Sequence, residues 1–183
     1  MAEITVVTGL PRSGTSLMMQ ILDASSLEVY TDGKRERDES NPAGYYELEA
    51  VKGIASDNRF LDDAQGKVVK IVAPIITYCK PDLNYRVVFM RREIEEILMS
   101  QEKMLNKDQS PEREKFRTIY EFHLKKTYAY LESNKIPYID VVYGELMRLP
   151  EIEIARVVDF LRISDDPTEL AKVVRPELYR NKI

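Results

Sequence analysis

Four short apolar runs recur along the chain, and the first three stop abruptly at Gly9, Pro74 and Arg91. The runs are too short for ordinary helices and rich in β-branched residues, which favours buried strands. They are Ile4–Thr8, Val68–Ala73, Arg86–Met90 and Tyr138–Tyr143. This pattern predicts four strands with long connections between them.

The connections carry apolar residues at helical spacing, which predicts amphipathic helices. Ser110-Pro111-Glu112 is a typical helix start, because proline suits the first helical position and acidic residues suit the positive first turn. The break at Lys135–Pro137 ends that helix. The expected helices are Thr15–Ala24, Ile94–Leu105, Ser110–Asn134, Glu151–Leu161 and Pro167–Val174.

Strands that alternate with helices predict an α/β fold with a parallel sheet covered on both faces. We expect one three-layer domain over residues 1–183 with a sheet of about four to five strands, similar to P-loop NTPases. Ligands of such folds bind beyond the carboxyl ends of the strands. That edge would hold Gly9–Ser16, Arg91–Arg92 and Tyr143, and the irregular segment Thr31–Gly44 would overhang it as an active-site loop.

Composition narrows the classes of ligand. The 183 residues are 44% hydrophobic and 32% charged, with a net charge of −4. This balance argues against a general nucleic-acid or membrane-surface binder, so any anion site is local. Cys79 is the only cysteine and His123 the only histidine, which excludes an intramolecular disulfide and argues against a metal site. Without a signal-like start or a membrane-length apolar run, we expect a cytoplasmic protein.

The segment Gly9–Ser16 has the G-x-x-x-x-G spacing of a phosphate-binding loop. Glycines let backbone N–H groups converge on an anion, and the following helix adds its positive end. A guanidinium and hydroxyls would complete the grip. The predicted ligand-binding residues are Gly9, Pro11, Arg12, Ser13, Gly14, Thr15 and Ser16.

The loop departs from that of kinases and GTPases. Thr15 stands where those proteins have a lysine, and no predicted strand ends in an aspartate for Mg²⁺. Asp140 lies mid-strand, where an edge or turn contact is the better interpretation. The cation is Arg12 instead, an arrangement that favours a sulfuryl group, which carries less charge than a phosphoryl group and needs no metal.

The run GLPRSGTS, Gly9–Ser16, resembles the 5′-phosphosulfate loop of sulfotransferases that use 3′-phosphoadenosine 5′-phosphosulfate (PAPS), particularly the bacterial and tyrosylprotein branches. The resemblance implies that Arg12 stabilises the departing phosphate. The family also has an arginine at a strand end and a serine eight residues later, which hold the 3′-phosphate. Arg92 and Ser100 match that spacing, although Glu93-Ile94 replaces the frequent Asn-Pro. Alternatively, Arg92 and Ser100 are simply exposed, with Arg92 paired to Glu95 or Glu96.

Other segments are similar to bacterial members of the family. They are Asn41–Glu47 (NPAGYYE), Val141–Leu146 (VVYGEL) and Leu178–Asn181 (LYRN). The first also reads as a tight turn with two packing tyrosines. Arg175 or Arg180 would reach the 3′-phosphate or lie solvated on the surface.

Sulfuryl transfer needs a base for the acceptor proton. Some members of the family use a histidine, but His123 lies in the apolar stripe of a predicted helix and fits a packed or boundary position. Other branches use a carboxylate, and Glu47 is the first choice, followed by Glu39 and Asp38. Lys70 is interpreted as a polar residue at a strand end.

The sequence thus predicts a PAPS-dependent sulfotransferase that acts on a hydroxyl or amine of a small-molecule or glycan acceptor and releases 3′,5′-ADP. No metal, nucleic acid or membrane partner is expected. Two other classes stay open: a P-loop phosphotransferase or nucleotide-binding protein, and a non-catalytic module that binds 3′-phosphoadenosine nucleotides. The acceptor and the oligomeric state stay open as well.

Overall fold

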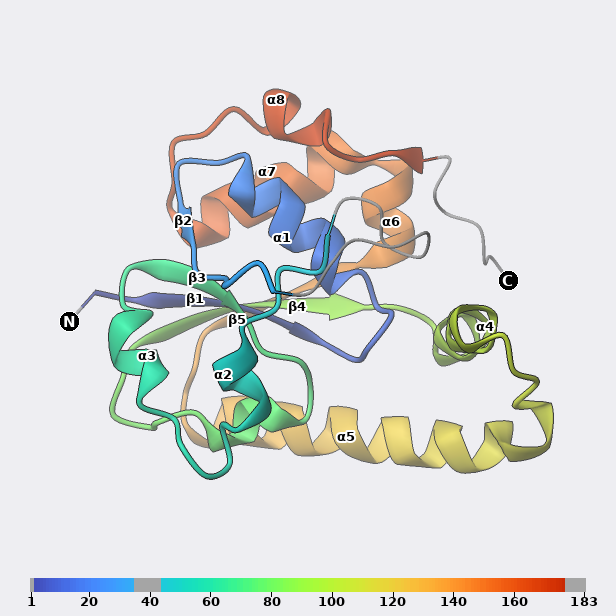
Figure 1. Cartoon of the computed structure of the whole chain (residues 1–183). Helices are drawn as coiled ribbons and strands as arrows, with labels where there is room; N and C mark the ends of the chain where they lie inside the picture. Colours follow the sequence, from blue (N-terminus) through green and yellow to red (C-terminus); the bar gives the residue numbers. More distant parts are fainter. Residues whose placement is uncertain (1, 35–43, 177–183) are drawn as a thin grey trace.

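The computed structural model describes residues 2–34 and 44–176. Their centre is a five-stranded sheet in which every pairing is parallel (Figure 1). The strands, in spatial order, are β2 (Glu28–Val29), β3 (Lys67–Lys70), β1 (Ile4–Gly9), β4 (Tyr85–Arg91) and β5 (Tyr138–Val142). The predicted α/β class with a parallel sheet is confirmed.

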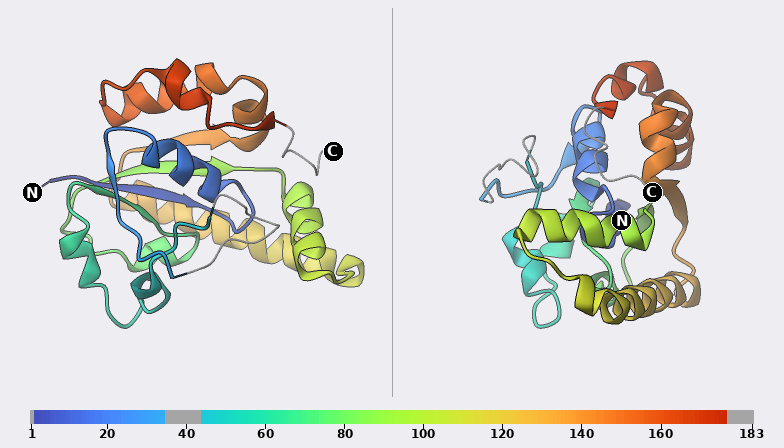
Figure 2. Two further views of the ribbon diagram at one scale, coloured as in Figure 1. Left: turned by 45° about the horizontal axis from the view of Figure 1, so that its top comes forward. Right: turned by 90° about the vertical axis from the view of Figure 1, so that its right-hand side faces the viewer.

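Helices cover both faces of this sheet (Figures 1 and 2). One face carries α1 (Thr15–Asp23), α6 (Tyr143–Arg148), α7 (Pro150–Leu161) and α8 (Pro167–Ala171). The other carries α2 (Glu49–Lys52), α3 (Phe60–Asp63), the 3₁₀ turn η1 (Ile75–Tyr78) and the long α5 (Arg113–Ser133). Beyond the end of β4 lies α4 (Ile94–Leu105), joined to α5 through η2 (Ser110–Glu112). No helix within residues 2–34 and 44–176 is both long and apolar enough to cross a membrane.

Strand alternation builds a core on each face. Val88 and Met90 of β4 point toward α1 and α6, whereas Val87 and Phe89 point toward α5. A third cluster packs the loop residue Leu10 against Ile97 and Leu98 of α4 and Tyr120 of α5. Full burial of a leucine side chain such as Leu10 contributes about 2 kcal/mol. This cluster fixes the loop after β1 relative to α4.

Some predicted boundaries were wrong. The strand predicted over Val68–Ala73 ends at Lys70, although Ile71 and Ala73 still donate backbone hydrogen bonds to β1, at 3.0 and 2.9 Å. Tyr143 opens α6 instead of ending β5, and Ser110–Glu112 forms a 3₁₀ turn before α5 begins. The two-residue β2 and the four-residue α2 and α3 are too short to produce a periodic signal.

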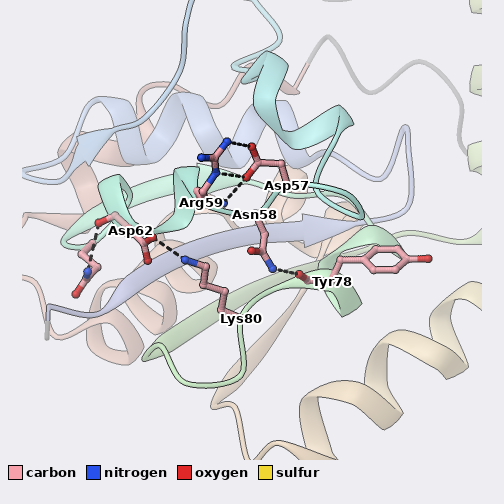
Figure 3. Close-up of polar contacts among 7 residues, drawn as sticks. Asp57, Asn58, Arg59, Asp62, Tyr78 and Lys80 are labelled. Carbon is pink, nitrogen blue, oxygen red and sulfur yellow. Dashed lines mark hydrogen bonds and ion pairs between the residues drawn. The ribbon is translucent and has the colours of Figure 1, made fainter.

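Polar contacts tie the region of α3 to the end of η1 (Figure 3). The side-chain amide of Asn58 donates to the carbonyl oxygen of Tyr78 at 3.1 Å, and the Lys80 ammonium donates to Asp62 at 2.6 Å. These contacts are exposed, so each contributes little to stability. They hold the connection that leads from β3 into β4.

The thiol of Cys79 provides a test of the core beneath η1. Burial leaves Cys79 5% exposed and raises its pKa to about 12. A thiol with this pKa is protonated at pH 8 and reacts slowly. We expect a disulfide reagent to leave the folded protein unlabelled at pH 8 and to label one thiol per chain in concentrated urea. Rapid labelling without urea would contradict this packing.

Candidate functional site

The segment Gly9–Ser16 forms a tight loop between β1 and α1, and two glycines make its path possible. Gly9 has φ +145° and Gly14 has φ +99°, values that L side chains rarely adopt. A Cβ at Gly14 would lie 2.4 Å from Cδ2 of Tyr143, and one at Gly9 would lie 2.5 Å from the carbonyl oxygen of Met90. Conformation and packing therefore both require glycine at these positions.

The first turn of α1 meets the end of this loop. Among the described residues, no side chain caps this helix end and its first turn holds no acidic residue. Thr15 is buried and Pro11 is exposed. The Ser13 hydroxyl is buried and has no hydrogen-bond partner in the described part of the chain. A positive helix end beside an unsatisfied hydroxyl fits a phosphate or sulfate group.

Arg12 joins the loop to α4. Its backbone is in the left-handed region, with φ +69°. Its Nε donates to the Ser100 hydroxyl at 3.1 Å, and its carbonyl oxygen accepts a hydrogen bond from Nη1 of Arg92 at 3.1 Å. The structure therefore brings together three site residues that the sequence predicts from positions about 80 to 90 apart.

Arg92 is held from two sides. Its Nε donates to Glu96 at 2.9 Å, which confirms the pairing with Glu96. The alternative of an exposed arginine and serine is wrong, because the Arg92 and Glu96 side chains and Ser100 are all less than a tenth exposed. Its guanidinium lies 4.5 Å from the centroid of the Tyr143 ring. Burial raises the pKa of the Tyr143 phenol, which keeps the ring neutral under the arginine. Glu96 and Ser100 are four residues apart and share one face of α4, so this face is directed at the loop.

Lys70 supplies a second cation beside the loop. Its ammonium donates to the carbonyl oxygen of Tyr45 at 2.5 Å and to the Ser16 hydroxyl at 3.2 Å. It also lies 3.6 Å from Oε1 of Glu47, and its side chain is only 5% exposed. In register, Lys70 is opposite Val7 of β1, on the face that α1 covers. Because Lys70 contacts both Ser16 of the loop and Glu47, the first-choice base, Glu47 lies close to the loop.

The segment that carries Glu47 is anchored on its other side. The Thr31 hydroxyl donates to the carbonyl oxygen of Glu47 at 2.8 Å. The Tyr46 phenol donates to Asp23 at the end of α1, also at 2.8 Å. The alternative bases Asp38 and Glu39 lie outside the described residues, as do Asn41–Ala43. Of the predicted overhanging segment, the structure describes residues 31–34 and Gly44, and the hydrogen bond from Thr31 joins one of these ends to Glu47.

The remaining candidates have different surroundings. The carbonyl oxygen of His123 accepts a hydrogen bond from Thr127 of the same helix, and burial followed by the charge of Lys126 lowers the pKa of the half-buried imidazole. Asp140 lies in the edge strand β5 and accepts a hydrogen bond from Tyr128. Arg175 is exposed. Leu178–Asn181, which includes Arg180, lies outside the described residues.

Lys70 ends β3, as predicted, but its contact with the loop was not predicted. A lysine inside a predicted buried run must find partners, because an unpaired buried charge is costly. That signal points to a functional position, but it does not say which neighbour the lysine meets. The meeting with Ser16 depends on β3 lying beside β1, which the sequence alone does not reveal.

No protein-family model matches this sequence, and no curated protein matches it. Solved structures share its fold. Sulfotransferase STF1 from Mycobacterium tuberculosis is 17% identical with a TM-score of 0.57, over 94% of this chain and 71% of its own. The sulfotransferase domain from the curacin biosynthetic pathway is 13% identical with a TM-score of 0.54, over 96% and 78%. STF9 from Mycobacterium avium is 11% identical with a TM-score of 0.53, over 93% and 67%. The fold is therefore that of sulfotransferases.

Proposed function

We propose that this protein is a sulfotransferase that binds PAPS and transfers its sulfuryl group to a hydroxyl or amine of a small-molecule or glycan acceptor. The observation that carries the proposal is the junction of the Gly9–Ser16 loop with Arg92 and Ser100. PAPS is anionic at both its 5′ and 3′ ends, so it needs two adjacent anion-binding groups. The fold shared with three solved sulfotransferases supports the same function.

Each group at the site has a role in this proposal. The loop amides and Arg12 would hold the 5′-phosphosulfate, and Arg92 with Ser100 would hold the 3′-phosphate. PAPS supplies the sulfuryl group. Glu47 accepts the proton of the attacking hydroxyl or amine. The Lys70 ammonium, next to Ser16, stabilises negative charge near the 5′ end.

Calorimetric titration tests the proposal against the two alternatives. We expect 3′,5′-ADP to bind tightly without Mg²⁺ and ATP to bind weakly with or without it. Binding of ATP that requires Mg²⁺, together with indifference to 3′,5′-ADP, would favour a phosphotransferase. Tight binding of 3′,5′-ADP without sulfuryl transfer from PAPS to any of a panel of acceptors would favour a non-catalytic binding module.

Replacing Arg92 with alanine tests the 3′-phosphate clamp. We expect the Kd for 3′,5′-ADP to rise by about tenfold to a hundredfold, because a charge-assisted fork is lost. Calorimetry on the folded variant measures the change.

A control is needed because Arg92→Ala leaves the buried carboxylate of Glu96 without its arginine, which can destabilise the protein. The double variant Arg92→Ala/Glu96→Ala removes both charges. It should bind 3′,5′-ADP as weakly as the single variant even if its melting temperature recovers. Wild-type affinity in either variant would contradict the clamp.

A further inference from the structure

A chain of hydrogen bonds crosses three elements on the α5 face of the sheet, next to the site. Nη1 of Arg91, at the end of β4, donates to the Tyr128 hydroxyl of α5 at 2.7 Å. That hydroxyl donates its own proton to Oδ1 of Asp140 in β5 at 2.6 Å. The Tyr128 ring stacks on Phe89 with centroids 4.5 Å apart and planes within 7°. The Tyr128 ring and hydroxyl thus contact both β4 and β5 on the α5 face of the sheet.

The Tyr128 phenol in this chain of hydrogen bonds stays protonated. Burial, and then the hydrogen bond to Asp140, raise the pKa of the Tyr128 phenol above its usual value. The phenol therefore keeps the proton that it donates to the carboxylate, while its oxygen accepts from Arg91. The three groups form one continuous link between an arginine and an aspartate.

On β4 the link lies one residue before the site, at Arg91, whereas on β5 it lies at Asp140, three residues before Tyr143. Arg91 pairs in register with Val142, and the residues that follow them are Arg92 and Tyr143. Because side chains alternate across a strand, Arg91 faces α5 while Arg92 lies on the opposite face. There the Arg92 guanidinium lies over the Tyr143 ring, which in turn packs against Gly14 of the loop.

Within the described residues, the carboxyl end of β5 has support from a neighbouring strand on one side only. β5 is an edge strand and pairs only with β4, so its carboxyl end has a ladder on one side. From outside the sheet, Nη2 of Arg156 also donates to the carbonyl oxygen of Asp140, at 3.5 Å, which is long. Tyr128 therefore adds a side-chain connection between the end of β4 and the middle of β5 to the backbone ladder of the two strands.

We propose that Tyr128, with Asp140, is a positioning residue for the 3′-phosphate clamp: it ties Arg91 to β5 and so holds Arg92 and Tyr143 in place. This inference rests on the proposed function. Tyr128 touches no ligand, and it acts through the strand ends that present Arg92 and Tyr143. Its loss should therefore weaken recognition of a 3′-phosphate more than recognition of the rest of the nucleotide.

The test compares 3′,5′-ADP with 5′-AMP, which lacks the 3′-phosphate. Tyr128→Phe keeps the ring that stacks on Phe89 and removes only the hydroxyl. We expect its Kd for 3′,5′-ADP to rise about tenfold and its Kd for 5′-AMP to change by less than about twofold. A matched control is Tyr130→Phe on the same helix, whose hydroxyl donates to the carbonyl oxygen of Cys79. The control should bind both nucleotides as the wild type does.

Variants of Asp140 keep the inference testable if Tyr128→Phe folds poorly. Asp140→Asn retains an oxygen acceptor and should keep most of the preference for 3′,5′-ADP. Asp140→Ala should lose it as Tyr128→Phe does. An unchanged preference in Tyr128→Phe, or an equal loss of affinity for both nucleotides, would overturn the inference. A wild type that does not prefer 3′,5′-ADP to 5′-AMP would overturn the proposed function itself.

Discussion

Replacing Lys70 with methionine is expected to slow sulfuryl transfer from PAPS by about a hundredfold to a thousandfold, the usual cost of removing one electrostatic stabiliser from an active site. Methionine matches the length and apolar stem of lysine without its charge. The variant loses the cation beside Ser16 and the partner of Glu47. The Kd for 3′,5′-ADP should change much less, because Arg92 and the loop amides remain.

The measurement is a single-turnover transfer assay combined with calorimetry on the same protein. Lys67→Met is the matched control, because Lys67 lies in the same strand but pairs with the exposed Glu28 at the opposite end. It should transfer at the wild-type rate. A Lys70→Met variant that transfers as fast as the control would show that the lysine is only structural.

Replacing Gly14 with alanine is expected to abolish measurable binding of 3′,5′-ADP and to destabilise the fold. The new methyl group would meet the Tyr143 ring at 2.4 Å, and φ +99° is unfavourable for alanine. Strain and overpacking together should cost about 2 to 5 kcal/mol. Denaturant unfolding measures the loss of stability, and calorimetry measures the loss of binding.

Gly33→Ala separates the two causes. Gly33 also has a positive φ, +64°, but a Cβ at this position would meet nothing within 4 Å. This variant should lose only about 1 kcal/mol, the cost of the backbone conformation, and should bind 3′,5′-ADP normally. Equal losses in the two variants would mean that contact with Tyr143 is unimportant.

The inner strands and the loop were predictable from the sequence because their signals are local. Ile4–Gly9 is a buried β-branched run that a glycine ends, and α1 follows at once with helical spacing. The Arg92–Ser100 spacing is local as well, since α4 carries Glu96 and Ser100 on one face. Such features depend on neighbours within about a dozen residues, which a sequence displays directly.

What the sequence could not show depends on which strands lie side by side. Lys70 meets Ser16 only because β3 neighbours β1, and Tyr128 reaches Asp140 only because α5 crosses under β4 and β5. Tyr143 was expected at the strand edge, but its packing on Gly14 arises from the turn into α6. Each of these contacts joins residues whose order in space is fixed by tertiary packing.

Strand order also keeps the proposed anion-binding groups away from one margin of the sheet. The anion-gripping groups come from the ends of β1 and β4 and from α4, near the middle of the sheet, whereas β2 at one margin contributes two residues and none of these groups. Segments added or removed at the β2 margin would therefore leave these groups in place. Under the proposed function, homologous proteins can differ at the β2 margin and still bind the same nucleotide.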